Sequence, residues 1–308
     1  MFANPADSVP VGGVPMTDLE FGLFRDLIRR ETGIALGEAK KVMVCARLGR
    51  RLRHHSLSSF QQYFDLVSRN DPAREELREL INCVTTNKTS FFREASHFDF
   101  LRQTILPAIR ERAAQGGGSS RSIRIWSAPC STGEEAYSIA ITVSEALGTT
   151  ANWDVKILGS DLDTNVLARA AAGIYPYESI AHLPASLTRH YFLKGKGVSN
   201  GLVAVKPSLR RLVHLRHINL IAPPWPIRGL FDVIFCRNLL IYFDRQTQDS
   251  LIRRLVKQLK PDGYLIVGQS EYLHWMRDVV EPVVGTIYRT RGDQCTWEGA
   301  GCPERASA

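Results

Sequence analysis

Several common features are absent from this sequence of 308 residues, and each absence excludes a class of protein. No apolar run reaches the roughly 18 residues that a membrane-spanning helix requires. The first residues contain neither a basic segment nor a long apolar core, so we expect no secretory signal. The six cysteines form no C-x-x-C pair, and no cysteine or histidine cluster has zinc spacing. We therefore expect a cytoplasmic protein with free thiols and no bound metal.

The charge of the chain is unbalanced. Basic residues outnumber acidic ones, 39 against 31, which gives a formal net charge of +8. A basic protein favours an acidic partner, which is a nucleic acid, an anionic membrane or an acidic protein surface. Charge alone does not choose among these three. The length fits one large or two modest domains, and a hydrophobic content of 44% is ordinary for a globular chain.

The first part of the chain shows only helical signals. Residues 1–15 are rich in proline, glycine and valine without a period, and we expect a flexible leader there. Thr17 and Glu20 then form a T-x-x-E capping box, which starts a helix. No strand-like alternation appears before residue 120, so residues 16–90 are predicted to form a small all-helical domain. Its further helices are predicted over 38–54, over 59–68 and from Asp71, which Pro72 follows.

A different pattern occupies residues 91–291, where a helix is predicted over 95–114 and short β-rich runs then alternate with helical segments. The runs are IRIWSA, VKILGSD, LVHLRHI, FDVIFC and YLIVG, with helices near 134–147, 164–172 and 246–260 and a Pro-Asp-Gly turn at 261–263. Such alternation predicts an α/β fold with a parallel sheet and helices on both faces. Residues 174–210 interrupt it and predict a small antiparallel β insertion, and residues 292–308 are expected to be a disordered tail.

The segment IRIWSAPCSTGEEAYSIA has the features of a ligand-binding turn. A predicted strand ends at Ser127, a turn of small residues follows, and a helix opens at Glu134. A doubly wound sheet binds nucleotide-like ligands at such a turn. Glu134 and Glu135 would repel a pyrophosphate at the helix start, but they suit a cation with ribose hydroxyls, such as S-adenosylmethionine. The alternative is that both glutamates only favour the helix dipole.

Polar residues also follow two other predicted strands. Asp161 ends the second strand, where an acid is well placed for ribose hydroxyls or an adenine edge. Asp163 has the alternative role of capping the next helix. Arg237 and Asn238 come directly after the buried run FDVIFC, so they are predicted to lie over the same ligand crevice.

Four runs, taken together, resemble the signature runs of a known family. They are TTNKTSFFRE (85–94), WSAPCSTGEEAYSIA (126–140), SDLDTNVLARAAAGIY (160–175) and FCRNLLIYFD (235–244). They are similar, in the same order, to runs of the chemotaxis receptor glutamate methyltransferases, the CheR family, and the resemblance extends from about residue 16 to 290. Pro129-Cys130 departs from the small residues expected in the turn, which should tolerate both.

The resemblance implies a fold and an activity. The fold is a Rossmann-like class I methyltransferase sheet with a small antiparallel β insertion, preceded by a small all-α domain. The activity is transfer of a methyl group from S-adenosylmethionine to glutamate side chains on the cytoplasmic helices of methyl-accepting chemotaxis receptors, with S-adenosylhomocysteine as the other product. A cytoplasmic monomer recruited to membrane-bound receptor arrays is expected, without membrane insertion or a nucleic-acid partner.

The resemblance also implies roles for individual residues. Arg93 and Tyr242 match residues beside the transferred methyl group and are the expected catalytic residues. Without the resemblance, Arg93 would be interpreted as an exposed arginine and Tyr242 as a core tyrosine. The residues that match cofactor-binding positions of the family are Asn87, Thr89, Arg93, Glu135, Asp161, Asn219, Leu220, Arg237 and Asn238.

A basic helix in the N-terminal part offers a candidate partner surface. Arg47, Arg50, Arg51 and His54 recur at helical spacing on one face, and Arg53 flanks it. Such a run is usually a solvated face. The resemblance suggests instead that Arg47, Arg50, Arg51 and Arg53 dock onto acidic receptor helices.

Two other functions were weighed against the receptor methyltransferase. A nucleic-acid methyltransferase fits the basic charge, but the chain has no Asn-Pro-Pro-Tyr-like run, and its Pro129-Cys130 lies in the cofactor turn rather than at a catalytic position. A non-catalytic module that senses a nucleotide or scaffolds receptors is opposed by the matching Arg93 and Tyr242.

Overall fold

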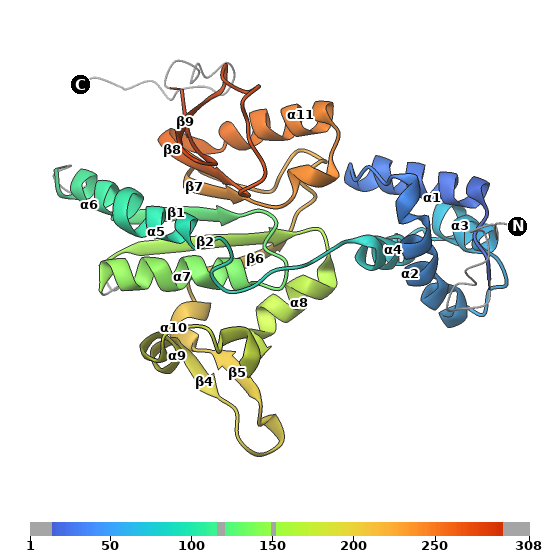
Figure 1. The fold of residues 1–308 in the computed structure, drawn as a ribbon, viewed down its shortest axis with the longest axis horizontal. Helices are drawn as coiled ribbons and strands as arrows, with labels where there is room; N and C mark the ends of the chain where they lie inside the picture. Colours follow the sequence, from blue (N-terminus) through green and yellow to red (C-terminus); the bar gives the residue numbers. More distant parts are fainter. Residues whose placement is uncertain (1–13, 116–120, 149–151, 292–308) are drawn as a thin grey trace, which may run out of the picture.

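The computed structural model describes residues 14–115, 121–148 and 152–291. Most of the expected leader and all of the expected tail lie outside these residues. Figure 1 shows a bundle of helices beside a larger α/β unit, from which a small sheet projects. None of the helices in the described ranges is both long and apolar enough to span a membrane.

The N-terminal helices pack around a single apolar core. They are α1 (Asp18–Thr32), η1 (Glu38–Lys40), α2 (Lys41–His54), α3 (Phe60–Arg69) and α4 (Glu75–Val84). The capping box is confirmed, because Thr17 accepts from the Glu20 amide and the Glu20 carboxylate accepts from the Thr17 amide. The buried side chains that form the core include Phe24, Leu48, Phe60, Tyr63 and Leu80.

The predicted start of the fourth helix is wrong by several residues. Helix α4 begins at Glu75, and the residue before it, Arg74, has a positive φ of 54°. Asp71 still caps the helix, but from a distance, since its carboxylate accepts from the amides of Glu75 and Leu77. A loop therefore separates the capping side chain from the first helical turn.

The main sheet has seven strands within the described residues, in the order β6-β2-β1-β7-β8-β10-β9. Its first five strands are parallel, and β10 runs antiparallel to both β8 and β9. The strands are β1 (Ser122–Ser127), β2 (Asp154–Asp161), β6 (Val213–His217), β7 (Phe231–Cys236), β8 (Leu259–Val267), β9 (Val280–Val284) and β10 (Ile287–Thr290). The predicted α/β fold is thus confirmed, and the two C-terminal strands are additional to the prediction.

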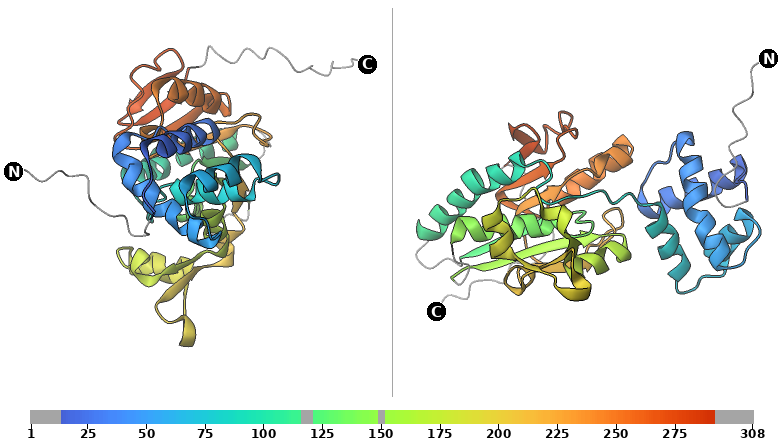
Figure 2. Two further views of the ribbon diagram at one scale, coloured as in Figure 1. Left: turned by 90° about the vertical axis from the view of Figure 1, so that its right-hand side faces the viewer. Right: turned by 60° about the horizontal axis from the view of Figure 1, so that its bottom comes forward.

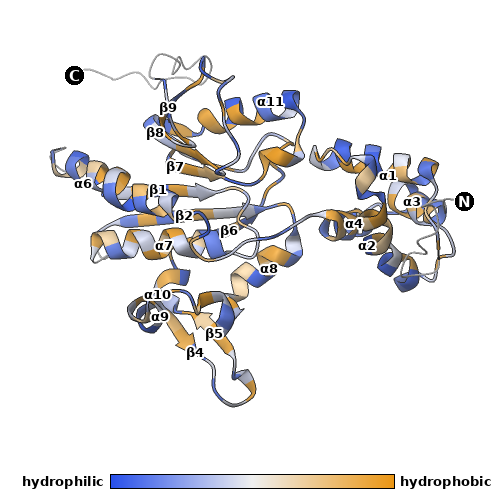
Figure 3. Ribbon diagram, in the orientation of Figure 1, coloured by the Kyte–Doolittle hydropathy of each residue, from blue (hydrophilic) through white to orange (hydrophobic). Residues whose placement is uncertain are grey.

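Helices cover both faces of this sheet (Figures 1 and 2). Every residue of β7 is buried, and its side chains alternate between two cores. Val233 and Phe235 belong to one core, and Ile234 and Cys236 belong to the other. Figure 3 shows β7 as apolar along most of its length. The covering helices are α5 (Ser96–Phe100), the π-helical turn η2 (Leu101–Ile105), α6 (Leu106–Gln115), α7 (Glu134–Leu147), α8 (Thr164–Ala172) and α11 (Arg245–Val256).

The Pro-Asp-Gly segment at 261–263 does not form the predicted turn between a helix and a strand. It lies inside β8, where pairing with β7 shifts register between Phe231 and Val233. Asp262 takes a positive φ of 62° there. The segment is an irregularity of the strand, because β8 already begins at Leu259.

The predicted insertion between α8 and β6 is a small antiparallel sheet in the order β3-β5-β4. It projects from the main body (Figures 1 and 2). Its elements are β3 (Ile174–Pro176), η3 (Tyr177–Ile180), α9 (Ala185–Tyr191), β4 (Phe192–Lys194), η4 (Gly197–Ser199), β5 (Leu202–Val205) and α10 (Pro207–Arg210).

Candidate active site

A cavity of about 400 Å³ lies between the helical bundle and the carboxyl ends of strands β1, β2 and β7. This volume is within the range of roughly 300–1,000 Å³ that is typical of small-molecule sites. The helical bundle contributes Ile34, Ala35 and Met43 to its wall. Every residue that matches a cofactor-binding or catalytic position of the family contributes to the wall: Asn87, Thr89, Arg93, Glu135, Asp161, Asn219, Leu220, Arg237, Asn238 and Tyr242.

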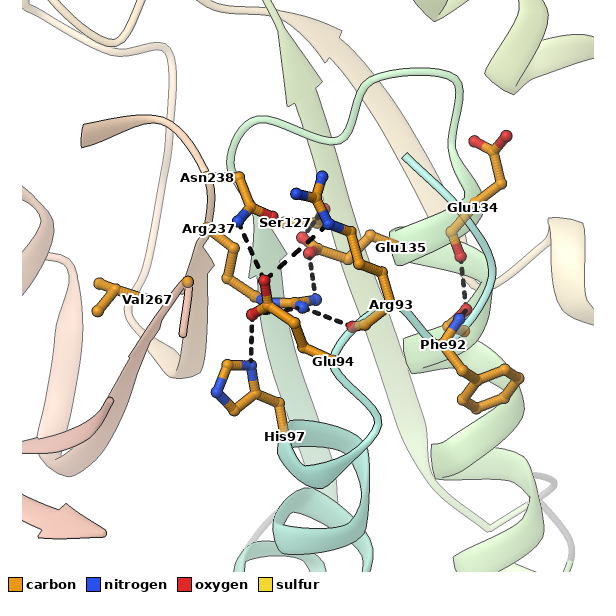
Figure 4. A network of polar contacts seen from close by, with 12 residues as sticks. Phe92, Arg93, Glu94, His97, Ser127, Glu134, Glu135, Arg237, Asn238 and Val267 are labelled. Atoms are coloured by element: carbon orange, nitrogen blue, oxygen red, sulfur yellow. Dashed lines mark hydrogen bonds and ion pairs between the residues drawn. The ribbon is translucent and has the colours of Figure 1, made fainter. Parts of the chain in front are cut away.

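The turn after β1 places Glu135 in the cavity wall. Gly133 caps α7 with a positive φ of 97°, and a Cβ atom there would meet Ala170 at 2.8 Å. The buried Glu135 carboxylate accepts from the Ser127 hydroxyl at 2.7 Å and from Arg237 at 2.8 Å. Glu134 lies outside the cavity wall and accepts from the Thr132 hydroxyl. The two adjacent glutamates therefore point to different surroundings, as Figure 4 shows.

Asp161 ends strand β2 as a buried acid. Its two oxygens accept from the backbone amides of Ser131, at 2.8 Å, and Asp163, at 3.0 Å. Burial raises the pKa of Asp161 to about 6, although these hydrogen bonds oppose the rise. A carboxylate has about four lone-pair positions, so Asp161 retains capacity to accept from a ligand hydroxyl.

Asp163 connects the segment before α5 to helix α8. Of the roles considered for Asp163, the structure shows the alternative one, a helix cap, because Oδ1 accepts from the backbone amides of Asn165 and Val166. Its Oδ2 accepts from the side-chain Nδ2 of Asn87 at 2.6 Å and from the Thr85 hydroxyl at 3.0 Å. Asn87 is therefore held in place by a residue outside the cavity wall.

Arg93 and Tyr242 enter the cavity wall from different elements. The Arg93 guanidinium donates to the carbonyl of Lys88 at 2.7 Å, and 36% of its side chain is exposed. Tyr242 ends the short helix η5 (Leu240–Tyr242), and its carbonyl accepts from the amide of Ala35 at 2.9 Å. The helical bundle thus fixes the backbone that carries Tyr242.

Arg237 forms the centre of a buried polar network (Figure 4). Its side chain is only 2% exposed and forms ion pairs with Glu94 at 3.0 Å and with Glu135 at 2.8 Å. The side-chain Nδ2 of Asn238 donates to the Glu94 carboxylate at 3.1 Å. His97 lies 3.5 Å from Glu94, and burial lowers the pKa of His97 to about 4, with the nearby charge of Arg237 adding to the decrease.

Asn219 and Leu220 occupy the wall in different ways. The Asn219 side chain donates to the carbonyl of Glu31 at 2.7 Å and accepts from the amide of Ile221. Leu220 is buried and apolar. Asn219 therefore joins the two parts of the molecule, and Leu220 supplies apolar surface to the cavity.

Ser131 in the cavity wall and Glu94 beside it hold other site residues in place, and neither was assigned a role from the sequence. Ser131 donates its amide to Asp161 and its hydroxyl to the carbonyl of Asn87. Glu94 binds both Arg237 and Asn238. Both lie inside the runs that resemble the family, but only their distant partners reveal what they do.

The expected exposed face of helix α2 needs a correction. Arg47 donates to the carbonyls of Val84 and Thr85 at the end of α4. Arg51 forms an ion pair with the buried Glu76, which also accepts from Tyr63 and His55. Both arginines therefore stabilise the helical bundle.

Two other basic residues of the same helix, Arg50 and Arg53, are exposed. Docking onto a partner stays a prediction for these two arginines.

The polar lining of the cavity fits a ligand that carries a positive charge and ribose hydroxyls. Glu135 and Asp161 are buried acids that attract a cation and accept hydroxyl hydrogen bonds. A pyrophosphate at the start of helix α7 would face the Glu135 carboxylate, which opposes a dinucleotide. Within the described residues, no group of three histidine, cysteine, aspartate or glutamate side chains is placed to hold a metal ion. The fold and the site define a class I methyltransferase dependent on S-adenosylmethionine.

Comparisons with known proteins identify the family within this class. The family model described as "CheR methyltransferase, all-alpha domain" matches residues 19–85. The model described as "CheR methyltransferase, SAM binding domain" matches residues 87–289. The chain belongs to the CheR family, and it is an S-adenosylmethionine-dependent methyltransferase that acts in chemotaxis.

Curated relatives cover most of the chain. It is 44% identical over 271 residues to chemotaxis protein methyltransferase 2 of Pseudomonas aeruginosa, covering 87% of this chain and 92% of the relative. It is 42% identical over 257 residues to the chemotaxis protein methyltransferase of Escherichia coli, covering 83% and 85%. The chemotaxis protein methyltransferase of Borreliella burgdorferi is 37% identical over 277 residues, covering 90% and 95%.

Proposed function

We propose that this protein methylates glutamate side chains on the cytoplasmic helices of methyl-accepting chemotaxis receptors, forming methyl esters. The observation that carries the proposal is that Arg93 and Tyr242 share one cavity wall with the buried acids Glu135 and Asp161. The two acids can bind a cation, and Arg93 on the same wall can bind an anion. The cavity therefore suits two substrates of opposite charge, a sulfonium cofactor and a carboxylate.

The target group needs little activation. A glutamate carboxylate has an unperturbed pKa of about 4.3, so it is deprotonated at neutral pH and requires no general base. S-adenosylmethionine supplies a methyl group on a positively charged sulfur. The protein must therefore orient the carboxylate and exclude water, and good orientation lowers the barrier by roughly 7–11 kcal/mol in favourable systems.

Arg93 is suited to hold the substrate carboxylate. Its bond to the Lys88 carbonyl anchors the guanidinium and leaves other N–H donors for a ligand. Holding one carboxylate oxygen leaves the other free to attack the methyl group. Tyr242, on the same wall, positions the carboxylate or lines the path of the methyl group.

The cofactor contacts are proposed for the residues that match the family. Glu135 and Asp161 bind the charged and ribose parts, and Leu220 packs beside the adenosine. The other proposed cofactor contacts are Asn87, Thr89, Arg93, Asn219, Arg237 and Asn238. We propose further that the exposed Arg50 and Arg53 attract acidic receptor helices, and that the protein acts as a cytoplasmic monomer recruited to receptor arrays.

A labelled-methyl assay tests the proposal. The protein is incubated with labelled S-adenosylmethionine and with receptor cytoplasmic fragments, RNA or DNA in parallel. We expect label on the receptor fragments only, in a product that alkali releases, because carboxyl methyl esters hydrolyse in base. Receptor fragments whose acceptor glutamates are changed to alanine serve as the control. Alkali-stable label, or label on nucleic acid alone, would overturn the proposal.

A further inference from the structure

Glu94 connects segments that are far apart in the sequence. Its side chain is 12% exposed, and its Oε1 accepts from the side-chain Nδ2 of Asn238 at 3.1 Å. Its Oε2 accepts from the backbone amide of Gln269 at 3.0 Å and pairs with Arg237 at 3.0 Å. These partners follow strands β7 and β8, so a single carboxylate ties the segment before α5 to the carboxyl edge of the sheet.

The backbone around Arg93 has an unusual conformation that needs such support. Phe92 and Glu94, the residues on either side, have positive φ values of 53° and 59°. A non-glycine residue adopts this region only when the surrounding structure holds it there. The Ser138 hydroxyl accepts from the Phe92 amide at 2.9 Å, and the Glu94 carboxylate secures the other side.

Arg237 adds a second link between Glu94 and Arg93. One of its nitrogens pairs with Glu94 and also donates to the carbonyl of Arg93 (Figure 4). Burial by itself would raise the pKa of Glu94, but the hydrogen bond from Asn238 and the charge of Arg237 outweigh it and lower the pKa. Glu94 is therefore an anion whose oxygens face donors on Asn238, Gln269 and Arg237.

We infer that Glu94 is a positioning residue for methyl transfer, which holds the Arg93 backbone so that the guanidinium meets the substrate carboxylate. Glu94 does not itself contribute to the cavity wall. The inference rests on the proposed function, because it assigns Glu94 a part in the same reaction. The anion matters to this role, since an amide at position 94 would lose the charge that pairs with Arg237 and would present an N–H group either to donors on Arg237 and Gln269 or to an Asn238 side chain that would have to flip.

The first test is a double-mutant cycle that combines Glu94→Gln with Arg93→Ala. We expect Glu94→Gln to lower kcat about tenfold or more, while KM and the affinity for S-adenosylhomocysteine stay within about threefold. In the Arg93→Ala background, Glu94→Gln should change kcat little, because the arginine through which it acts is gone. Additive effects on kcat, or an unchanged kcat in the single variant, would overturn the inference.

A matched control comes from helix α5, which begins two residues after Glu94. Asp99 pairs with Arg102 at 2.8 Å on the surface, outside the network. The variant Asp99→Asn removes a comparable charge and should keep kcat and stability. A wild-type protein that does not methylate receptor fragments would refute the proposed function and not the role of Glu94.

If the wild-type protein does not methylate receptor fragments, a measurement without substrate still tests the role of Glu94. Amide hydrogen exchange over residues 88–95, followed by mass spectrometry, should be faster in Glu94→Gln than in wild type and in Asp99→Asn. Equal exchange in all three proteins would overturn the inference whatever the substrate is, because the segment would then be held without the carboxylate.

Discussion

Arg29 of helix α1 forms an ion pair with Asp244 at 2.6 Å, across the junction between the helical bundle and the methyltransferase sheet. Asp244 also caps helix α11 by accepting from the Thr247 amide. It lies two residues after Tyr242, whose carbonyl accepts from Ala35 of the helical bundle. The bundle therefore both covers the cavity and fixes the segment that carries a proposed catalytic residue.

The two functions of Asp244 predict different effects for three variants. Arg29→Ala removes an exposed pair and should cost about 0.2–1 kcal/mol of unfolding free energy. Asp244→Asn keeps a capping oxygen and should lose about as much unfolding free energy as Arg29→Ala. Asp244→Ala also loses the cap, at a further cost of about 0.5–2 kcal/mol. Urea denaturation measures all three. Equal losses for Arg29→Ala and Asp244→Ala would contradict the capping role.

The cluster around Glu76 predicts an acid-sensitive helical bundle. Burial would raise the pKa of Glu76, but hydrogen bonds from Arg51, Tyr63 and His55 outweigh it and lower the pKa to about 2. Because the folded pKa is depressed, this stabilisation is complete above about pH 4.5 and is lost as the pH falls towards 2.

Arg51→Ala should lower the unfolding free energy by about 3 kcal/mol at neutral pH, since the buried Glu76 carboxylate loses its guanidinium partner and keeps only Tyr63 and His55. The same variant should weaken the acid dependence. Urea denaturation at several pH values gives both quantities, with the exposed Arg50→Ala as the control. An Arg51→Ala protein as stable as Arg50→Ala would show that the pair contributes nothing.

Charge reversal at Arg50 and Arg53 tests the docking surface without disturbing the bundle. The double variant with glutamate at both positions should raise KM for a receptor fragment and flatten its dependence on salt. Affinity for S-adenosylhomocysteine and thermal stability should not change, because both side chains are exposed and neither contributes to the cavity wall. Steady-state kinetics over a range of salt concentrations measures the effect. An unchanged KM would refute docking by these arginines.

The variants Arg93→Ala and Tyr242→Phe should keep the fold and bind cofactor within a few-fold, yet lose turnover. A decrease of about 10²-fold in kcat corresponds to roughly 2.7 kcal/mol of transition-state stabilisation. Labelled-methyl kinetics measures turnover, and calorimetry with S-adenosylhomocysteine measures binding. Full activity in either variant would remove that residue from the catalytic assignment.

Asp161 predicts a pH dependence of cofactor binding. Burial raises its pKa to about 6, so the carboxylate becomes protonated as the pH falls through 6. The protonated form has lost acceptor capacity for ribose hydroxyls and its attraction for a cation. Affinity for S-adenosylmethionine should therefore decrease as the pH is lowered from about 7 to about 5.

The variant Asp161→Asn separates this carboxylate from other titrating groups. It should bind more weakly than wild type at neutral pH and show little change over the same pH interval. Calorimetry at each pH value gives the comparison. A parallel pH dependence in wild type and Asp161→Asn would assign the titration to another residue.

Features that depend on residues close together in the chain could be predicted from the sequence alone. The Thr17–Glu20 capping box and the strand-turn-helix at Ser127 to Glu134 involve partners within a few residues, and both were predicted correctly. The cap at Asp163 is equally local, and the sequence offered it as an alternative. The alternation of β-rich and helical runs likewise predicted the α/β fold, because the spacing of apolar residues that distinguishes a strand from a helix is a local property of the chain.

The directions in which the long polar side chains point depend on contacts between distant segments, and these become visible only in the folded protein. Arg51 lies at the predicted position on helix α2, but Glu76, 25 residues away, turns it into the bundle. Glu94 meets Asn238 and Gln269 across separations of 144 and 175 residues, which no local pattern encodes. Helical spacing specifies a face, but the elements that pack against that face determine whether its charges meet solvent or one another, because a buried charge must find a partner.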